Sequence, residues 1–120
     1  MRCLKLAGSI EGVCKMNLVI SKNKIPIRFT DERWKHISLG HPEMANYYYE
    51  IIETIEVPEK IYEGNYDEII AIKHFEKLND KFVVVVYKEI NNEDGFIITA
   101  YISNKVNEFL KRKLIWDSQK

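Results

Sequence analysis

The sequence predicts an α+β domain, with an N-terminal β-hairpin and two helices followed by an antiparallel sheet of about four strands. Two apolar runs flank Ser-Lys-Asn-Lys within residues 16–29, which is typical of a hairpin. Helix signals follow, and β-branched and aromatic residues then dominate residues 69–103. Because the helices precede the strands instead of alternating with them, a parallel βαβ sheet is disfavoured. The length of 120 residues fits a single domain, residues 1–120.

Two helices are predicted after the hairpin. Thr30 is a favourable N-cap, and two acidic residues follow it in the first turn, where the helix dipole favours negative charge. We therefore expect a helix at about 31–39 that Gly40 ends. Pro42 suits the start of a second helix at about 43–56, whose apolar residues recur on one stripe.

Strands are expected in the rest of the chain, at Ile61-Tyr62 and at residues 69–76, 82–90 and 96–103. Asp94-Gly95 is a strong hairpin-turn signal between the last two. Alternation along the last strand predicts an apolar face toward the helices, made of Phe96, Ile98, Ala100 and Ile102. The opposite face carries Ile97, Thr99, Tyr101 and Ser103. Residues 104–116 are compatible with either a helix or an extended segment.

The charge is balanced but unevenly distributed. A net charge of zero gives no global signature of a nucleic-acid-binding protein. Residues 1–30 carry six Lys/Arg against one acid, residues 31–68 three against ten, and residues 96–120 five against two. If the basic ends meet on the sheet, they form a local positive surface; otherwise the pattern is ordinary solvated charge.

The cellular environment is predicted from two further features. Cys3 and Cys14 are too few for a disulfide framework, and their spacing is not CxxC, so we expect two reduced thiols in a cytoplasmic protein. No apolar run approaches the length that spans a bilayer, so no membrane association is expected.

The stretch RWKHISLGHPE, residues 33–43, holds the residues best suited to chemistry. Arg33 and His36 are three apart and share a helix face, while His41 is held by a Gly-His-Pro corner. An imidazole can act as general acid or base, and a guanidinium binds phosphate through a two-pronged contact. A capped helix corner with surface imidazoles explains the same pattern without catalysis.

No metal or cofactor is expected. His36 and His41 are five apart, outside the HExxH spacing of zinc sites. A histidine beside an arginine suits phosphodiester chemistry, and in RNA the 2′-hydroxyl is itself the nucleophile, so no metal is required. The hydroxyl row of Thr99 and Tyr101 offers groups that could orient a phosphate. A solvent-facing strand also favours Thr and Tyr, so periodicity alone leaves both interpretations open.

Three runs, IPIRFTDERWKHISLGHPEM, IIETIEVPEKIYEG and VVVVYKE…DGFIITAYIS, together resemble phage-type members of the Barnase–EndoU–Colicin–RelE-like (BECR) nuclease superfamily. The resemblance covers about residues 25–116. It implies N-terminal helices followed by a four-stranded antiparallel sheet. It also implies a toxin-like, metal-independent endoribonuclease that leaves a cyclic phosphate.

The matching motifs assign roles by resemblance. The catalytic candidates are Arg33, His36, His41, Thr99 and Tyr101: one histidine as general acid/base, Arg33 on the scissile phosphate, and the hydroxyls as orienting groups. The RNA backbone would be held by Lys73, Lys105, Lys111, Arg112 and Lys113. The implied partners are RNA, with tRNA as one candidate, and an inhibitory antitoxin or immunity protein.

Two other function classes fit the sequence. One is a non-catalytic RNA-binding or protein-binding module on the same fold. The other is a structural or regulatory partner, such as a phage protein linked to assembly. Loss of cleavage on histidine substitution would distinguish the enzyme from both.

Overall fold

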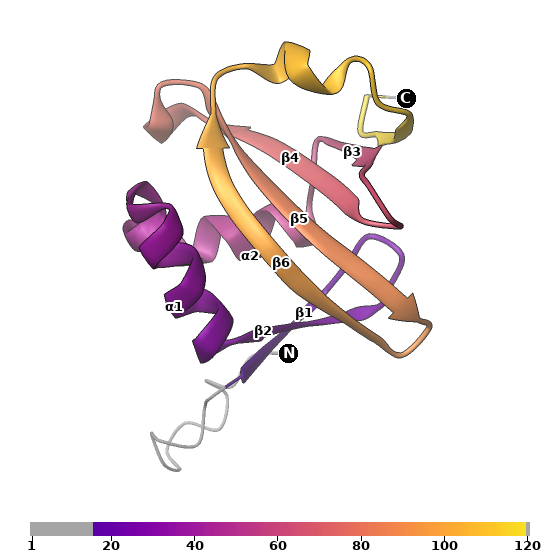
Figure 1. The fold of residues 1–120 in the computed structure, drawn as a ribbon. Coiled ribbons are helices and arrows are strands. Elements are labelled where there is room, and N and C mark those ends of the chain that lie inside the picture. The colour runs from indigo at the N-terminus through magenta and orange to yellow at the C-terminus, as the bar shows by residue number, and fades with distance from the viewer. Residues whose placement is uncertain (1–15, 120) are drawn as a thin grey trace.

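The computed structural model describes residues 16–119, which form a seven-stranded sheet with two α-helices against one face (Figure 1). The first elements are β1 (Met16–Ile20), β2 (Pro26–Thr30), α1 (Asp31–Gly40), the 3₁₀-helix η3 (Pro42–Asn46) and α2 (Tyr48–Glu56). They are followed by β3 (Lys60–Glu63), β4 (Ile69–Phe75), η4 (Glu76–Leu78), β5 (Lys81–Asn91), β6 (Asp94–Ser103), η5 (Val106–Phe109) and β7 (Leu114–Asp117). The strand order across the sheet is β1-β2-β6-β5-β4-β3-β7.

The predicted fold class is wrong, because the sheet is larger and mixed. The hairpin β1–β2 forms, but it belongs to the same sheet as the later strands: β2 pairs parallel with β6, Ile27 opposite Gly95 and Arg28 opposite Phe96. On the other side, β3 and β7 extend the sheet, and β7 comes from the tail whose conformation the sequence left open. These pairings join segments far apart in the chain, so local periodicity carries no record of them.

The parallel junction depends on a close approach at Gly95. A Cβ placed there would lie 2.5 Å from the carbonyl oxygen of Lys88 and 2.6 Å from Cδ1 of Ile27, so only glycine fits without movement. Gly95 was expected in the hairpin turn, but it lies inside β6, opposite Glu89. The turn itself is made by the two residues that precede Asp94.

The N-terminus of α1 is as predicted, and its C-terminus differs. The Thr30 hydroxyl accepts a hydrogen bond from the backbone N–H of Arg33 at 3.0 Å, which confirms the N-cap. Gly40 remains within the helix and does not adopt a left-handed conformation. The second predicted helix is split into η3 and α2, with Tyr47 between them.

The two faces of the sheet bury different cores. Between the helices and the sheet lies the larger core, which includes Ile37, Met44, Ile51 and Ile55 from the helical side. The far face carries a smaller cluster of Tyr62, Ile70, Ile72 and Val84, and Phe109 of η5 packs on it. The tail after β6 therefore covers part of the face that the helices leave open (Figure 1).

The alternation predicted for residues 96–103 is wrong in its first half. The register of β6 against β5 shifts by one residue at a bulge that contains Ile98. The bulge turns Ile97 into the helix-covered core, where Phe96 and Ile98 were expected. Past the bulge the predicted faces hold, and Tyr101 lies with the far-face cluster.

Of the two expectations about the cellular environment, no membrane association and two reduced cysteines, the structure bears only on the first. None of the helices in residues 16–119 has the length and apolar character needed to cross a membrane. Cys3 and Cys14 lie outside the described residues.

Replacing Gly95 by alanine is expected to lower the free energy of unfolding by about 1–3 kcal/mol, because the added methyl group overpacks the β2–β6 junction. Urea denaturation would measure the change. Gly40→Ala is the matched control: nothing lies within 4 Å of its added Cβ, so its effect should stay within about 1 kcal/mol. Equal stability of wild type and Gly95→Ala would contradict the tight junction.

Candidate functional site

His41 forms the corner between α1 and η3, and its backbone is held on both sides. Its N–H donates to the carbonyl of Ile37 at 2.7 Å, and its own carbonyl accepts from the N–H of Met44 at 2.8 Å. Nδ1 of its half-exposed imidazole lies 3.6 Å from a carboxylate oxygen of Glu43. The side chain is therefore both positioned by its backbone and accessible to a ligand.

The aromatic ring of Tyr101 lies against this imidazole. The two ring centroids are 5.6 Å apart and the planes are tilted by 31°. His41 comes from the helical corner and Tyr101 from the far face of β6, where Val84 is its cross-strand neighbour. The fold thus brings together two candidates that are 60 residues apart in the sequence.

The charges around Tyr101 come from the tail. Burial raises the pKa of the Tyr101 hydroxyl, and the negative charge of Glu108 raises it further, while the positive charge of Arg112 lowers it. The Arg112 guanidinium is oriented by hydrogen bonds to the carbonyl of Glu63 at 3.5 Å and to Oδ1 of Asn65 at 3.3 Å. The Tyr101 hydroxyl therefore stays protonated at neutral pH, and the positive charge of Arg112 acts on it.

Arg33 lies further along β6, on the side where α1 runs beside this strand. Its Nη1 donates to the carbonyl oxygen of Ile98 at 3.3 Å. Ile98 is three residues before Tyr101, a distance of about 10 Å along a strand. Arg33 and His41 are eight residues apart, about 12 Å along a helix axis. Arg33 and His41 thus lie at opposite ends of a line that follows α1 beside β6.

The other two catalytic candidates are not joined to this pair by any hydrogen bond, ion pair or ring contact within residues 16–119. His36 is exposed on α1, between Arg33 and His41 in the sequence. Thr99 is half-buried and lies opposite Val86 in the sheet.

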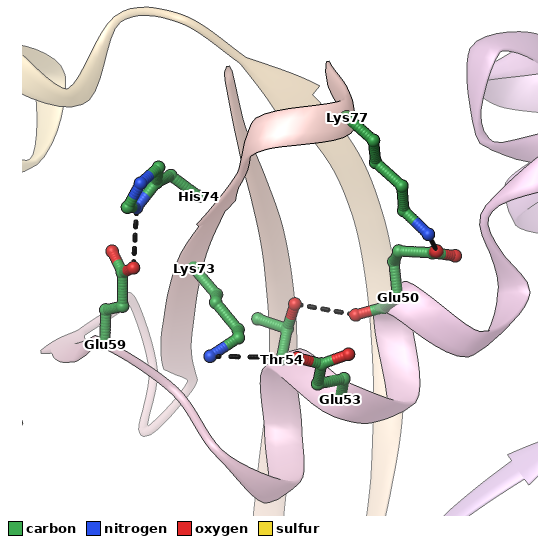
Figure 2. Close-up of polar contacts among 7 residues, drawn as sticks. All are labelled: Glu50, Glu53, Thr54, Glu59, Lys73, His74 and Lys77. Atoms are coloured by element: carbon green, nitrogen blue, oxygen red, sulfur yellow. Dashed lines mark hydrogen bonds and ion pairs between the residues drawn. The ribbon is translucent and has the colours of Figure 1, made fainter. Parts of the chain in front are cut away.

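The predicted RNA-binding cations are distributed over different faces. Lys73 points toward the helices, and its Nζ lies 3.8 Å from a carboxylate oxygen of Glu53 on α2 (Figure 2). It therefore faces away from Tyr101. Lys111 and Lys113 are exposed in the segment before β7, and Lys105 follows the end of β6.

The third histidine has its own carboxylate partner. Nδ1 of His74 lies 2.6 Å from a carboxylate oxygen of Glu59, and its ring packs 5.8 Å from that of Phe82 (Figure 2). Within residues 16–119, no three side chains of His, Cys, Asp or Glu come together in a way that could hold a metal ion.

An open groove of about 650 Å³ lies beside the His41–Tyr101 pair. Its walls are η3, the connection between β4 and β5, and the residues that end and follow β6. Lys77, Lys81 and Lys105 line it. Only Lys105 was expected to bind RNA. Lys77 lies in η4 and Lys81 is the first residue of β5; neither belongs to a motif, so sequence patterns gave no reason to select them.

Comparison with known proteins found no matching family model, no matching curated protein and no matching solved structure. A functional assignment for this chain therefore rests on its motifs and on the geometry described above.

The tail charges are expected to control the titration of Tyr101. Glu108→Gln should lower the pKa of the Tyr101 hydroxyl, because the negative charge that disfavours phenolate is removed. Arg112→Gln should raise it, because phenolate loses a stabilising cation. NMR of ¹³C-labelled tyrosine, with Tyr101→Phe to assign the signal, would follow the titration. Shifts of the same sign in both variants would contradict this placement of the tail.

Proposed function

We propose that this chain is a metal-independent endoribonuclease related to the phage-type BECR nucleases. The observation that carries the proposal is the contact between His41 and Tyr101, ring centroids 5.6 Å apart, at an accessible corner of the sheet. Both residues lie in the motifs that resemble this superfamily. Their chemistry suits the cleavage of RNA by its own 2′-hydroxyl.

In the proposed reaction, His41 accepts the proton of the 2′-hydroxyl while the 2′-oxygen attacks the adjacent phosphorus. The bond from phosphorus to the 5′-oxygen breaks, and that oxygen takes a proton from the Tyr101 hydroxyl. The products are a 2′,3′-cyclic phosphate and a 5′-hydroxyl. The proton on His41 then returns to the tyrosinate, directly or through water, which restores both side chains.

The cations are assigned by their electrostatic effect on Tyr101 or by their place along α1 and β6. Arg112, whose charge reaches Tyr101, stabilises the negative charge that develops on the scissile phosphate. Arg33 lies about three strand residues away on the line of α1 and β6, so it binds another part of the RNA backbone. Thr99 orients the RNA strand from the face of the sheet opposite the helices. Lys73, paired with Glu53, has no part in the proposed site.

The histidine assignment can be tested by cleavage of tRNA and of an end-labelled RNA oligonucleotide in EDTA. His41→Ala is expected to reduce the rate by about 10²–10⁴, the usual contribution of a general acid/base. His36→Ala, the other histidine of the motif, should cleave at a rate close to that of the wild type. Replacing the cleaved nucleotide by its 2′-deoxy form should abolish cleavage, because the nucleophile is gone.

The outcomes separate the function classes. Activity retained in His41→Ala but lost in His36→Ala would transfer the role to His36 and contradict the assignment. Binding of RNA by the wild type without cleavage would instead favour the non-catalytic RNA-binding module. Circular dichroism of each variant would show that the fold is intact.

A further inference from the structure

The groove adjoins the His41–Tyr101 pair through the residues that follow each of these two residues in the sequence, although neither His41 nor Tyr101 lines it. Pro42 and Glu43, which follow His41, form part of one wall, and Ile102 and Ser103, which follow Tyr101, form part of another. Tyr101 lies with the far-face cluster and Ile102 packs against the helix-covered core. A ligand strand with one linkage at the His41–Tyr101 pair would therefore reach this groove around the side of β6, where β2 pairs only as far as Phe96. Its volume of about 650 Å³ lies within the usual range of binding pockets.

The charge of the groove is positive although the chain is neutral. Three lysines line it against one acidic side chain, Glu43. Within residues 16–119, no acidic side chain forms an ion pair with Lys81 or Lys105. The two ammonium groups come from the start of β5 and from the residues after β6, so tertiary structure brings them together.

Lys77 differs from the other two lysines because its ammonium group is already paired with an acidic side chain of α2. Its ammonium forms an ion pair with Glu50 of α2, whose side chain is only 11% exposed (Figure 2). Glu50 would otherwise be a largely buried carboxylate without a counterion, which is costly. Lys77 therefore serves the fold, and ligand charge is left mainly to Lys81 and Lys105.

Uncharged polar groups complete the lining. The amides of Asn46, Asn79 and Asn104 and the hydroxyl of Ser103 provide both donors and acceptors. Such groups suit the Watson–Crick edges of bases, which an RNA strand exposes only where it is unpaired. In a duplex these edges are already paired, so they could not bond to the groove lining.

We propose that this groove binds the single-stranded RNA that flanks the cleaved linkage, with Lys81 and Lys105 on its phosphates. The inference rests on the proposed nuclease function for the location of the cleaved linkage. Binding can nevertheless be measured without cleavage, so the two can fail separately.

The test is the salt dependence of binding to a fluorescent 2′-O-methyl RNA oligonucleotide, which cannot be cleaved by 2′-hydroxyl attack. Fluorescence anisotropy would give Kd between 50 and 200 mM salt, roughly the range over which phosphate contacts are sensitive. Lys81→Gln and Lys105→Gln should each weaken binding. Each should also reduce the slope of log K against log salt by about 0.7, the value for one phosphate contact to a single strand.

Lys24→Asn is the matched control, because it removes one exposed lysine in the β1–β2 turn. That turn contacts Glu89 through Asn23, eight residues along β5 from Lys81, or about 26 Å. Asparagine also tolerates the positive φ of 68° at this position. Its binding slope should match that of the wild type.

Four results are informative. Reduced slopes in the groove variants with cleavage by the wild type support both proposals, and kinetics should then show a raised KM with kcat retained. Reduced slopes without cleavage support the groove and overturn the nuclease. Cleavage with unchanged salt slopes in Lys81→Gln and Lys105→Gln overturns the groove proposal alone. An equal reduction of the slope in Lys24→Asn would also overturn it. Stronger competition by duplex RNA than by single-stranded RNA would contradict the stated ligand.

Discussion

The short parallel pairing between β2 and β6 is the constraint on which the rest of the structure depends. Only Ile27 and Arg28 pair with β6, where Gly95 allows the two backbones to approach, and the Arg28 guanidinium contacts both oxygens of Asp94 at 2.8 and 3.2 Å. Beyond this point β2 ends at Thr30, and α1 begins beside β6 in its place. That replacement carries the end of α1, and with it His41, to the ring of Tyr101.

Ion pairs between α2 and the β4 region stabilise the helix-covered side of the sheet. On the helix-covered side, acids of α2 neutralise lysines of the β4 region: Glu53 pairs with Lys73 and Glu50 with Lys77 (Figure 2). On the far side, the cluster around Tyr101 is covered only in part by η5. With the pairs of Glu43 with His41 and Glu59 with His74, at least four of the ten acidic residues in residues 31–68 have a cationic or histidine partner.

The ligand proposed above, RNA, is highly negative, whereas the chain has a net charge of zero. Non-specific affinity for nucleic acid follows the number of phosphates that a surface neutralises, and a net charge of zero provides little long-range attraction. In the proposal, Lys81 and Lys105 would attract the RNA locally instead. A surface of this kind would favour binding at one place over weak association across the whole molecule.

Much of the local structure follows from the sequence, whereas the topology and the site do not. The hairpin, the Thr30 cap, the start of α1 and the main strands could be predicted, because caps, turns and hydrophobic periods act over a few residues. The corner at His41 was also visible as Gly-His-Pro. The parallel pairing at Gly95, the addition of β7 and the bulge at Ile98 arise from contacts between distant segments. The same is true of the site: the sequence selected His41 and Tyr101 by residue type, but only the packing of α1 along β6 placed their rings together. Lys77 and Lys81 lie near the β4–β5 connection and Lys105 follows β6, with no shared sequence pattern, so tertiary structure decided that they line one surface.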